Sequence, residues 1–260
     1  MIEFISDSYE TLNKIRETIE KQLTGAYLRF GDGDVILREG GNDSIQRGNP
    51  KIAEEMKETF SLSGDGIIKC LHLHSDKFGC MPKMAPIVHK WDDGFAEYML
   101  NCSIKYFENE KIYSPVALHY LGIYDKEFTI DFLRFIRKHK PILVGNQNIP
   151  PDVVYKLFNG PAHIKTPATH SFNEIDRIEN ETLQELDKHV NDYQVIVMAM
   201  GCSGRVLSKR ILKKEKYKVF IFDFGSLLDF MCGWNTRAWI GLTRVPPNFF
   251  EDMMYEISRE

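Results

Sequence analysis

The chain has 260 residues, of which 43% are hydrophobic and 27% charged, and its formal net charge is −4. This composition excludes intrinsic disorder, and the mildly acidic balance lacks the basic character of a nucleic-acid-binding protein. No apolar run approaches the ~20 residues that a transmembrane helix needs, so we expect no membrane span and no nucleic-acid partner.

The amino terminus and the cysteines bear on location and assembly. Residues 1–7 lack the basic start and long apolar segment of a secretory signal, which predicts a cytoplasmic protein. The five cysteines are scattered and include no Cys-x-x-Cys pair, which argues against a disulfide framework and a zinc ribbon. The length fits one large α/β domain or two small ones; we expect a single domain over residues 1–260, and the oligomeric state stays open.

Helix and strand patterns alternate along the chain. Apolar spacing predicts helices over about 8–23, from 50 to about 60, over 82–100, before 138–140, and over 152–158 and 173–190. Apolar runs predict strands over 26–30, 67–74, 141–146, 194–200 and 217–223, with a short extended piece at 162–165. Residues 112–121 fit neither period and stay unassigned. Buried strands separated by helices predict a Rossmann-like, mostly parallel sheet flanked by helices on both faces.

The first strand ends in a segment rich in glycine and aspartate, Arg29-Phe30-Gly31-Asp32-Gly33-Asp34. We expect a turn in which the two glycines adopt positive φ and let a ligand approach the backbone. Asp32 and Asp34 offer hard oxygen ligands for Mg²⁺ or Mn²⁺, and Arg29 offers a planar fork for phosphate oxygens. A solvated acidic turn is the alternative interpretation.

A second glycine turn, Met200-Gly201-Cys202-Ser203-Gly204-Arg205, follows the strand at 194–200 and opens a helix. The unpaired N–H groups and the dipole at such a helix start predict an anion site, with the Ser203 hydroxyl as a further donor. The spacing lacks the three glycines of a dinucleotide motif and the Gly-Lys-Ser/Thr of a P-loop, so NAD and ATP are poorly supported. A purely structural turn is the alternative.

The strand at 217–223 ends at Asp223, with Ser226 close behind. An acid in this position commonly holds a ribose hydroxyl in α/β folds, although either residue could simply cap the following short helix. Asp229 and the nearby Trp234 and Trp239 suit a sugar site, although buried aromatic residues more often belong to the core.

The histidines give weaker signals. His72 and His74 alternate along one predicted strand and, with Cys70 or Cys80, suggest a transition-metal site, but no fourth ligand has a recognisable spacing. His170 precedes a helix and is a candidate acid or base, with a hydrogen-bonded loop histidine as the alternative.

Three segments together resemble one known family: Arg29 to Asp34, Ile142 to Asn146 with Ser171 and Phe172, and Gly201 to Asp223. They are similar to the GT-D type glycosyltransferases, once grouped as a domain of unknown function in bacterial glycosylation clusters, over about residues 25–230. In that family an Asp-x-Glu pair serves metal and sugar-nucleotide binding, which maps onto Asp32 and Asp34. The second acid is one methylene shorter here, and residues 233–237 do not closely match the family's C-terminal region.

The resemblance implies a hexosyltransferase that moves a sugar from a nucleotide-diphosphate donor, a UDP-sugar, to a hydroxyl of a glycan or glycoconjugate. It implies Mn²⁺ or Mg²⁺ at Asp32 and Asp34. We expect the donor to contact Arg29, Gly31, Gly201, Ser203, Gly204, Asp223 and Ser226, and catalysis to use Asp34, Asp229 and His170. Two other functions fit the same motifs: a Mg²⁺-dependent phosphohydrolase, with the Asp-x-Asp pair supplying metal ligands and a nucleophile, and a noncatalytic nucleotide- or glycan-binding module.

Overall fold

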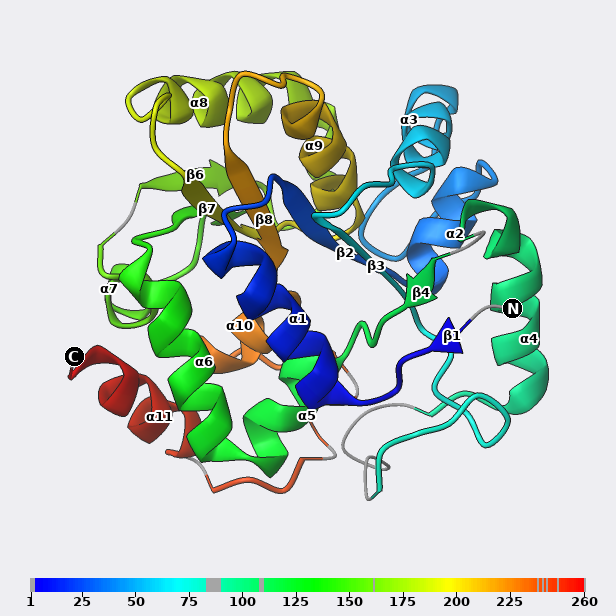
Figure 1. The fold of residues 1–260 in the computed structure, drawn as a ribbon, viewed down its shortest axis with the longest axis horizontal. Helices are drawn as coiled ribbons and strands as arrows, with labels where there is room; N and C mark the ends of the chain where they lie inside the picture. The colour runs from blue at the N-terminus through cyan, green and yellow to red at the C-terminus, as the bar shows by residue number, and fades with distance from the viewer. Residues whose placement is uncertain are drawn as a thin grey trace.

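A computed structural model of the chain describes residues 3–82, 90–107, 110–160, 162–237, 239, 241, 243–246 and 248–259. Its central element is a six-stranded sheet in the order β3-β2-β8-β7-β5-β6, in which every pairing is parallel (Figure 1). The strands are β2 (Gly25–Phe30), β3 (Ile67–Leu71), β5 (Ile142–Asn146), β6 (His163–Thr166), β7 (Gln194–Ala199) and β8 (Val219–Asp223). A separate parallel pair joins β1 (Glu3–Phe4) to β4 (Lys111–Ile112).

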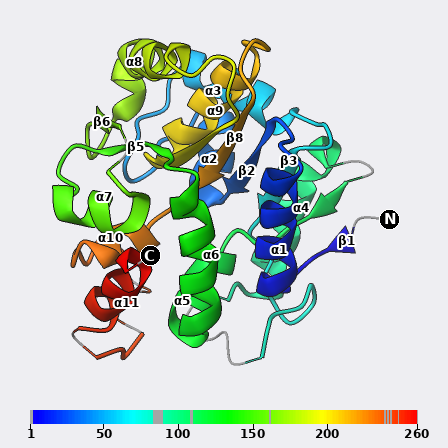
Figure 2. The same cartoon turned by 60° about the vertical axis from the view of Figure 1, so that its left-hand side comes forward.

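Helices cover both faces of the sheet because its strands bury apolar side chains on both sides; Tyr27 faces one layer and Leu28 the other. One layer contains α1 (Ser8–Glu20), α5 (Ala117–Tyr124), α6 (Lys126–Lys138), α7 (Pro151–Phe158), α10 (Leu227–Met231) and α11 (Phe249–Ser258). The other contains α2 (Asp32–Arg38), α3 (Pro50–Phe60), α8 (Ile175–Asp187) and α9 (Cys202–Leu212). In Figure 2, α6 and α11 lie on the near side. The expected Rossmann-like architecture is confirmed.

Three short helical elements complete the described fold. Helix α4 (Asp93–Ser103) packs against α2, and the 3-10 turns are η1 (Ile104–Tyr106) and η2 (Ser171–Glu174). Among the described residues, none of the helices combines the length and the apolar character needed to cross a bilayer.

Local sequence signals explain where the main helices begin. Asp125 caps α6, accepting a hydrogen bond from the Phe128 N–H at 3.0 Å, and Asn49 caps α3 in the same way, with Pro50 in the first turn. Helix α6 also ends in Arg137 and Lys138, whose charge complements the helix dipole. Its apolar face is buried, which stabilises the fold by about 1.5–3 kcal/mol for each large side chain.

Several boundaries differ from the sequence prediction. Helix α1 ends at Glu20, three residues before the predicted end, and Gly25 is the first residue of β2. Strand β3 ends at Leu71, so His72 and His74 lie beyond it. Residues 112–121 contain the end of β4 and most of α5, which explains why neither period fitted. The helix predicted over 82–100 falls partly on 83–89, outside the described residues, and its described part begins at Asp93.

Strands β2 and β8 are neighbours whose following segments leave toward opposite faces. The chain after β2 enters α2 and α3 on one face, whereas the chain after β8 enters α10 on the other. In parallel α/β sheets such a divergence opens a crevice at the carboxyl ends of the two strands, where ligands bind. The fold therefore predicts a ligand site near Arg29 on β2 and Asp223 on β8.

Candidate active site

Four charged side chains meet where β2 and β8 end. Nη1 of Arg29 lies 3.4 Å from Oδ1 of Asp223, and Nη2 of Arg205 lies 3.4 Å from Oδ2 of the same carboxylate. Nε of Arg205 lies 3.5 Å from Oδ1 of Asp34. Guanidinium groups and carboxylates thus alternate, and the two positive charges balance the two negative ones. Because these separations exceed the 2.7–2.9 Å or so of a strong charge-assisted hydrogen bond, the ion pairs are loose enough to be exchanged for ligand contacts.

Arg205 is fixed by the backbone around it. Its Nε donates to the Arg29 carbonyl at 2.8 Å, its Nη1 donates to the Gly201 carbonyl at 2.6 Å, and its Nη2 also reaches the Arg29 carbonyl. Burial opposes its charge, but Asp223 and Asp34 outweigh burial and raise the pKa of Arg205 above its usual value. It therefore stays cationic between the two acids. Sequence analysis treated Arg205 as the end of a glycine turn and missed this position.

Asp34 belongs to a helix start and not to an open turn. It is the third residue of α2, and its Oδ2 accepts the Gly31 N–H at 2.8 Å. The predicted positive φ is wrong: Gly31 has φ −118°, and Gly33 lies inside the helix. Unpaired N–H groups at a helix start attract acidic side chains, which explains why the helix forms here. Gly33 is needed for another reason, because a Cβ there would lie 2.6 Å from Oδ1 of Asp43.

The two aspartates of this segment face different surroundings. Asp34 is 1% exposed, and burial raises its pKa, opposed by Arg205 and the Gly31 N–H. The Cys202 thiol also approaches the carboxylate as a weak donor, and Oδ1 of Asp34 has no further hydrogen-bond donor in the described part of the chain. Asp32 is exposed in the same helical turn. Nowhere in the described chain do three or more His, Cys, Asp or Glu side chains form a metal-binding group, including around His72, His74, Cys70 and Cys80.

His119, in α5, is a second site residue that sequence analysis missed. Both ring nitrogens lie 3.5 Å from Nη2 of Arg29, and its Nε2 lies 3.2 Å from Oγ of Ser226. The indole N–H of Trp239 donates to the same hydroxyl at 3.2 Å. Burial, reinforced by the Arg29 charge, lowers the pKa of His119 well below its usual value, so the ring is neutral. His119 thus connects Arg29 to the Ser226 hydroxyl, and that hydroxyl connects to Trp239, near the carboxyl end of β8.

The Gly201 turn lies beneath a loop formed by residues 43–47. Gly201 has φ +61°, and a Cβ there would lie 2.5 Å from Cδ1 of Ile45. The Ser203 hydroxyl donates to Oε1 of the buried Gln46 at 3.2 Å, and the Phe172 N–H donates to the same oxygen at 3.1 Å. Gly204 packs closely on β7, where a Cβ would lie 2.8 Å from Cγ of Met198. Ser203 and Gly204 are thus buried under protein, whereas the Gly201 carbonyl accepts from Arg205, the same side chain that pairs with Asp223.

The two candidate bases occupy different environments. The His170 N–H donates to the Ile45 carbonyl at 2.8 Å, and its Nδ1 accepts the Arg47 N–H at 3.3 Å, so the neutral ring carries its proton on Nε2. His170 therefore anchors the 43–47 loop. Asp229, in α10, accepts a hydrogen bond from the Thr236 hydroxyl at 2.8 Å. Burial raises the pKa of Asp229, while Thr236 and Arg237 oppose that rise.

Residues 27–228 match the family model described as the glycosyltransferase GT-D fold. The chain belongs to the GT-D fold family. The matched segment carries Arg29, Asp34, Arg205 and Asp223, so all four charged residues of the β2–β8 edge lie within the GT-D region. Membership supports glycosyltransferase as the class of activity. No curated protein matches this GT-D chain.

Three solved structures share the GT-D architecture. A selenomethionine-substituted structure of domain of unknown function 1792 has a TM-score of 0.63 at 19% identity, covering 87% of this chain and 79% of that chain. A second, described as showing that this highly conserved domain has a distinct glycosyltransferase fold, has a TM-score of 0.62 at 20% identity, covering 86% and 78%. A new glycosyltransferase of the same domain type from Streptococcus sanguinis has a TM-score of 0.62 at 18% identity, covering 92% and 88%. At these identities the likeness establishes the GT-D fold.

Proposed function

We propose that this GT-D protein is a hexosyltransferase that moves a sugar from a UDP-sugar to a hydroxyl of a glycan or glycoconjugate. The observation that carries the proposal is the alternation of Arg29, Asp223, Arg205 and Asp34 at the carboxyl ends of β2 and β8. A nucleotide diphosphate needs cationic partners and a ribose-hydroxyl acceptor, and this edge provides both. The side chains of Arg29, Arg205 and Asp223 are 11–13% exposed, so each remains within reach of a ligand.

The chemistry requires stabilisation of the leaving group. When the bond between the anomeric carbon and the phosphate oxygen breaks, negative charge builds on the departing diphosphate. Arg29 and Arg205 are held in place by backbone carbonyls before the donor arrives, so they can stabilise this charge without reorganising. Asp223, released from its loose pairs, then accepts a ribose hydroxyl, and the Ser226 hydroxyl and the Trp239 ring border the same space.

The GT-D resemblance is what supports a divalent cation beside Asp34. Oδ1 of Asp34 accepts no hydrogen bond in the described part of the chain and lies 3.5 Å from Nε of Arg205, and the exposed Asp32 precedes it by two residues in α2. Asp32 and Asp34 are the residues that would hold Mn²⁺ or Mg²⁺, which would supply further charge neutralisation at the diphosphate when bound.

Asp229 is the better of the two candidate bases for activating the acceptor hydroxyl. A general base works best when its pKa approaches the working pH, and burial raises the pKa of Asp229 in that direction. His170 is less suited because Nδ1, the nitrogen free of hydrogen in the neutral ring, already accepts a backbone hydrogen bond. In the phosphohydrolase alternative, Asp32 would be the more accessible nucleophile of the pair, because Asp34 is 1% exposed.

The test is a thermal-shift screen of nucleotide sugars with and without Mn²⁺, followed by an assay of donor consumption with and without glycan acceptors. We expect a UDP-sugar to raise Tm, and Arg205→Gln to remove that rise. Arg177→Gln is the charge-matched control, since Arg177 pairs with Glu174 and Glu181 on the exposed side of α8. Phosphate release without transfer would identify a phosphohydrolase, stabilisation without turnover would identify a binding module, and no response to any nucleotide sugar would contradict the proposed transferase.

A further inference from the structure

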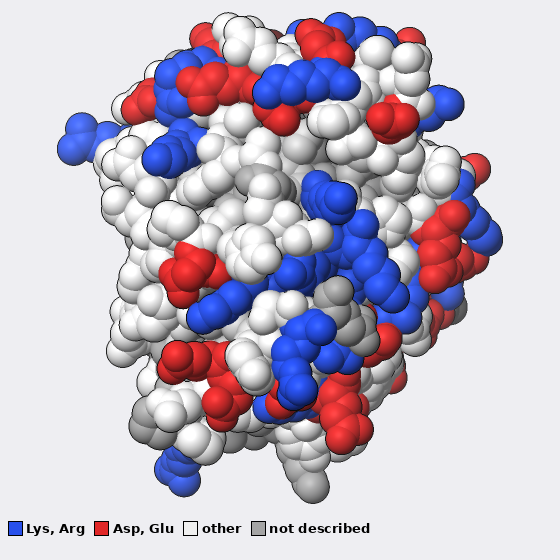
Figure 3. All heavy atoms as spheres, turned by 90° about the vertical axis from the view of Figure 1, so that its left-hand side faces the viewer, with Lys and Arg blue, Asp and Glu red and all other residues white. Residues whose placement is uncertain are grey.

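A second charged surface lies on α6, α7 and α11 and uses none of the residues of the β2–β8 site. Lys and Arg side chains gather across the middle of this face (Figure 3). Two hollows there share Arg134, and we call them together the basic groove. The larger, of about 370 Å³, is lined by Lys126, Arg134, Asp252, Tyr255, Glu256 and Arg259. The smaller, of about 70 Å³, is lined by Arg134, Arg137, Lys138, Asn159 and Ile257.

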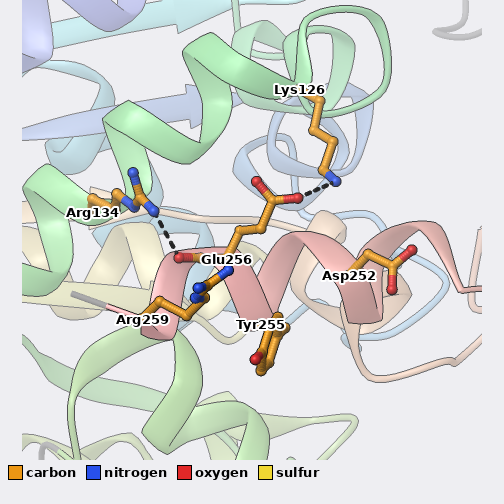
Figure 4. A pocket seen from close by; sticks show the side chains of 6 residues that line it. All are labelled: Lys126, Arg134, Asp252, Tyr255, Glu256 and Arg259. Atoms are coloured by element: carbon orange, nitrogen blue, oxygen red, sulfur yellow. Dashed lines mark hydrogen bonds and ion pairs between the residues drawn. The ribbon is translucent and has the colours of Figure 1, made fainter.

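The larger hollow is partly neutralised by its own residues. Lys126 Nζ lies 2.8 Å from Oε1 of Glu256, and Arg134 Nη2 donates to the Glu256 carbonyl at 2.9 Å, as Figure 4 shows. Asp252 lies at the far end from Arg134 and points away from it (Figure 4). This hollow adjoins the smaller one at Arg134, and the exposed Tyr255 is part of its lining.

The smaller hollow has three cationic side chains and no carboxylate on its lining. Arg137 is 8% exposed, and its guanidinium lies 5.8 Å from the centre of the Tyr155 ring. In the described part of the chain, Nε of Arg137 has no hydrogen-bond partner, and none of the carboxylates there forms an ion pair with this side chain. Burying a charge without a partner is costly, and proteins normally supply a counter-ion. Arg137 is thus a largely buried cation without a counter-ion in the described part of the chain.

We propose that the basic groove binds a phosphate group, with Arg137 and Lys138 as its main contacts. A guanidinium presents a planar fork that matches phosphate oxygens, and a phosphate group carries one negative charge as a diester and nearly two as a monoester at neutral pH. Lys138 is exposed at the end of α6 and adds a mobile cation beside the fixed Arg137. The phosphate belongs either to a soluble phosphate compound or to an anionic lipid headgroup. This site is independent of the proposed transfer reaction.

The experiment compares pyrophosphate in solution with vesicles of phosphatidylcholine and phosphatidylglycerol in equal amounts. Thermal shift at constant ionic strength measures the first, and co-sedimentation, with pure phosphatidylcholine as reference, measures the second. Pyrophosphate is also expected at the β2–β8 site, so the decisive quantity is the difference between wild type and Arg137→Met. Lys138→Gln tests the exposed contact without disturbing the core. Lys156→Gln is the charge-matched control, because Lys156 pairs with Asp152 along α7 outside both hollows.

We expect Arg137→Met to weaken binding by about tenfold or more, Lys138→Gln to weaken it less, and Lys156→Gln to leave it unchanged. A Tm response to pyrophosphate that Arg137→Met reduces identifies soluble phosphate compounds as ligands of the basic groove, and phosphatidylglycerol-dependent sedimentation that Arg137→Met reduces identifies lipid headgroups. Equal responses of wild type, Arg137→Met and Lys138→Gln in both arms would overturn the proposal. Arg137→Met also removes an unpaired buried charge, so it should keep or raise Tm without ligand, and its loss of binding would not reflect unfolding.

Discussion

Arg29 and Gly225 share one small space at the carboxyl ends of β2 and β8: a methyl group on Gly225 would lie 1.6 Å from Nη1 of Arg29. The same methyl group would lie 2.9 Å from Cε1 of His119. Gly225 has φ +70°, a backbone conformation that other residues rarely adopt. The missing side chain at Gly225 therefore lets the Arg29 guanidinium reach Asp223.

Gly225→Ala should disable the site. The methyl group would displace Arg29, and a displacement of about 1 Å in a positioned group costs on the order of 10²-fold in kcat/KM. Gly233→Ala is the matched control, since Gly233 has φ +78° but nothing within 4 Å of a Cβ. Both variants should lose about 1–2 kcal/mol of stability to backbone strain, and only Gly225→Ala should lose transfer. Similar activity in the two variants would rule out the clash as the cause.

Asp34→Asn should keep the fold and lose the reaction. An amide oxygen still accepts the Gly31 N–H, but the charge opposite Arg205 and the oxygen available to a cation are changed. We expect transfer to fall on the order of 10²–10³-fold. Asp32→Ala, at an exposed position, should leave stability within about 0.5 kcal/mol and should abolish any rise in Tm on adding Mn²⁺. Steady-state rates of transfer for each variant, measured with Mn²⁺ or with EDTA, check these expectations. Full activity in the variant that combines Asp32→Ala with Asp34→Asn would refute the assigned metal ligands.

The dependence of transfer on pH should report Asp229. A base acts as the carboxylate, and burial raises its pKa, so activity should decline as pH falls through that raised pKa. The Thr236 hydrogen bond lowers the same pKa, so Thr236→Val should move the acid limb of kcat/KM to higher pH. His170→Gln should leave that limb in place. An acid limb that moves with His170 and ignores Thr236 would reverse the assignment.

The stability of the fold should fall in mild acid. Burial lowers the pKa of His74 from 6.5 to about 4, whereas the unfolded chain binds this proton near 6.5. Between these values the unfolded state holds more protons, so the free energy of unfolding decreases as pH falls, by up to about 3 kcal/mol. His119 contributes in the same direction. Nε2 of His74 lies 2.9 Å from Oγ of Ser114, a contact that the amide of His74→Gln can keep. Urea unfolding across this range should show a shallower dependence of stability on pH for His74→Gln, and an unchanged dependence would exclude His74 as the cause.

The sequence predicts the fold well where the spacing of apolar residues and the positions of strand ends determine the structure. The runs ending at Phe30, Asn146 and Asp223 are strands in one parallel sheet, and because the strands are parallel their carboxyl ends share one edge. The order of the strands along the sheet, which makes β2 and β8 neighbours, is not encoded in these local patterns.

The features that could not be predicted, His119, Arg205 and the loop over the Gly201 turn, share a physical cause: they depend on tertiary contacts and not on local sequence pattern. His119 lies in α5, a helix buried nearly all round, so its apolar residues show no clear face. Arg205 is one helical turn beyond Gly201, and only the packing of α9 on β2 brings it between two acids. The Gly201 turn has the expected backbone start, but the 43–47 loop lies over it, a long-range contact that no spacing encodes.

The pairing of β2 with β8 also bears on how the protein is made. Arg29 and Asp223 are separated by 194 positions in the sequence, and no strand between them in the chain joins β2 to β7. During synthesis the ribosome must therefore release β8 before β2 gains its second neighbour and before the charged edge exists. Such long-range pairing slows folding, and until β8 has been synthesised one edge of β2 has no partner strand. A nascent chain arrested before Val219 would hold five of the six strands of the main sheet in two disconnected sets, β3 with β2 and β7 with β5 and β6, and would be a natural substrate for chaperones.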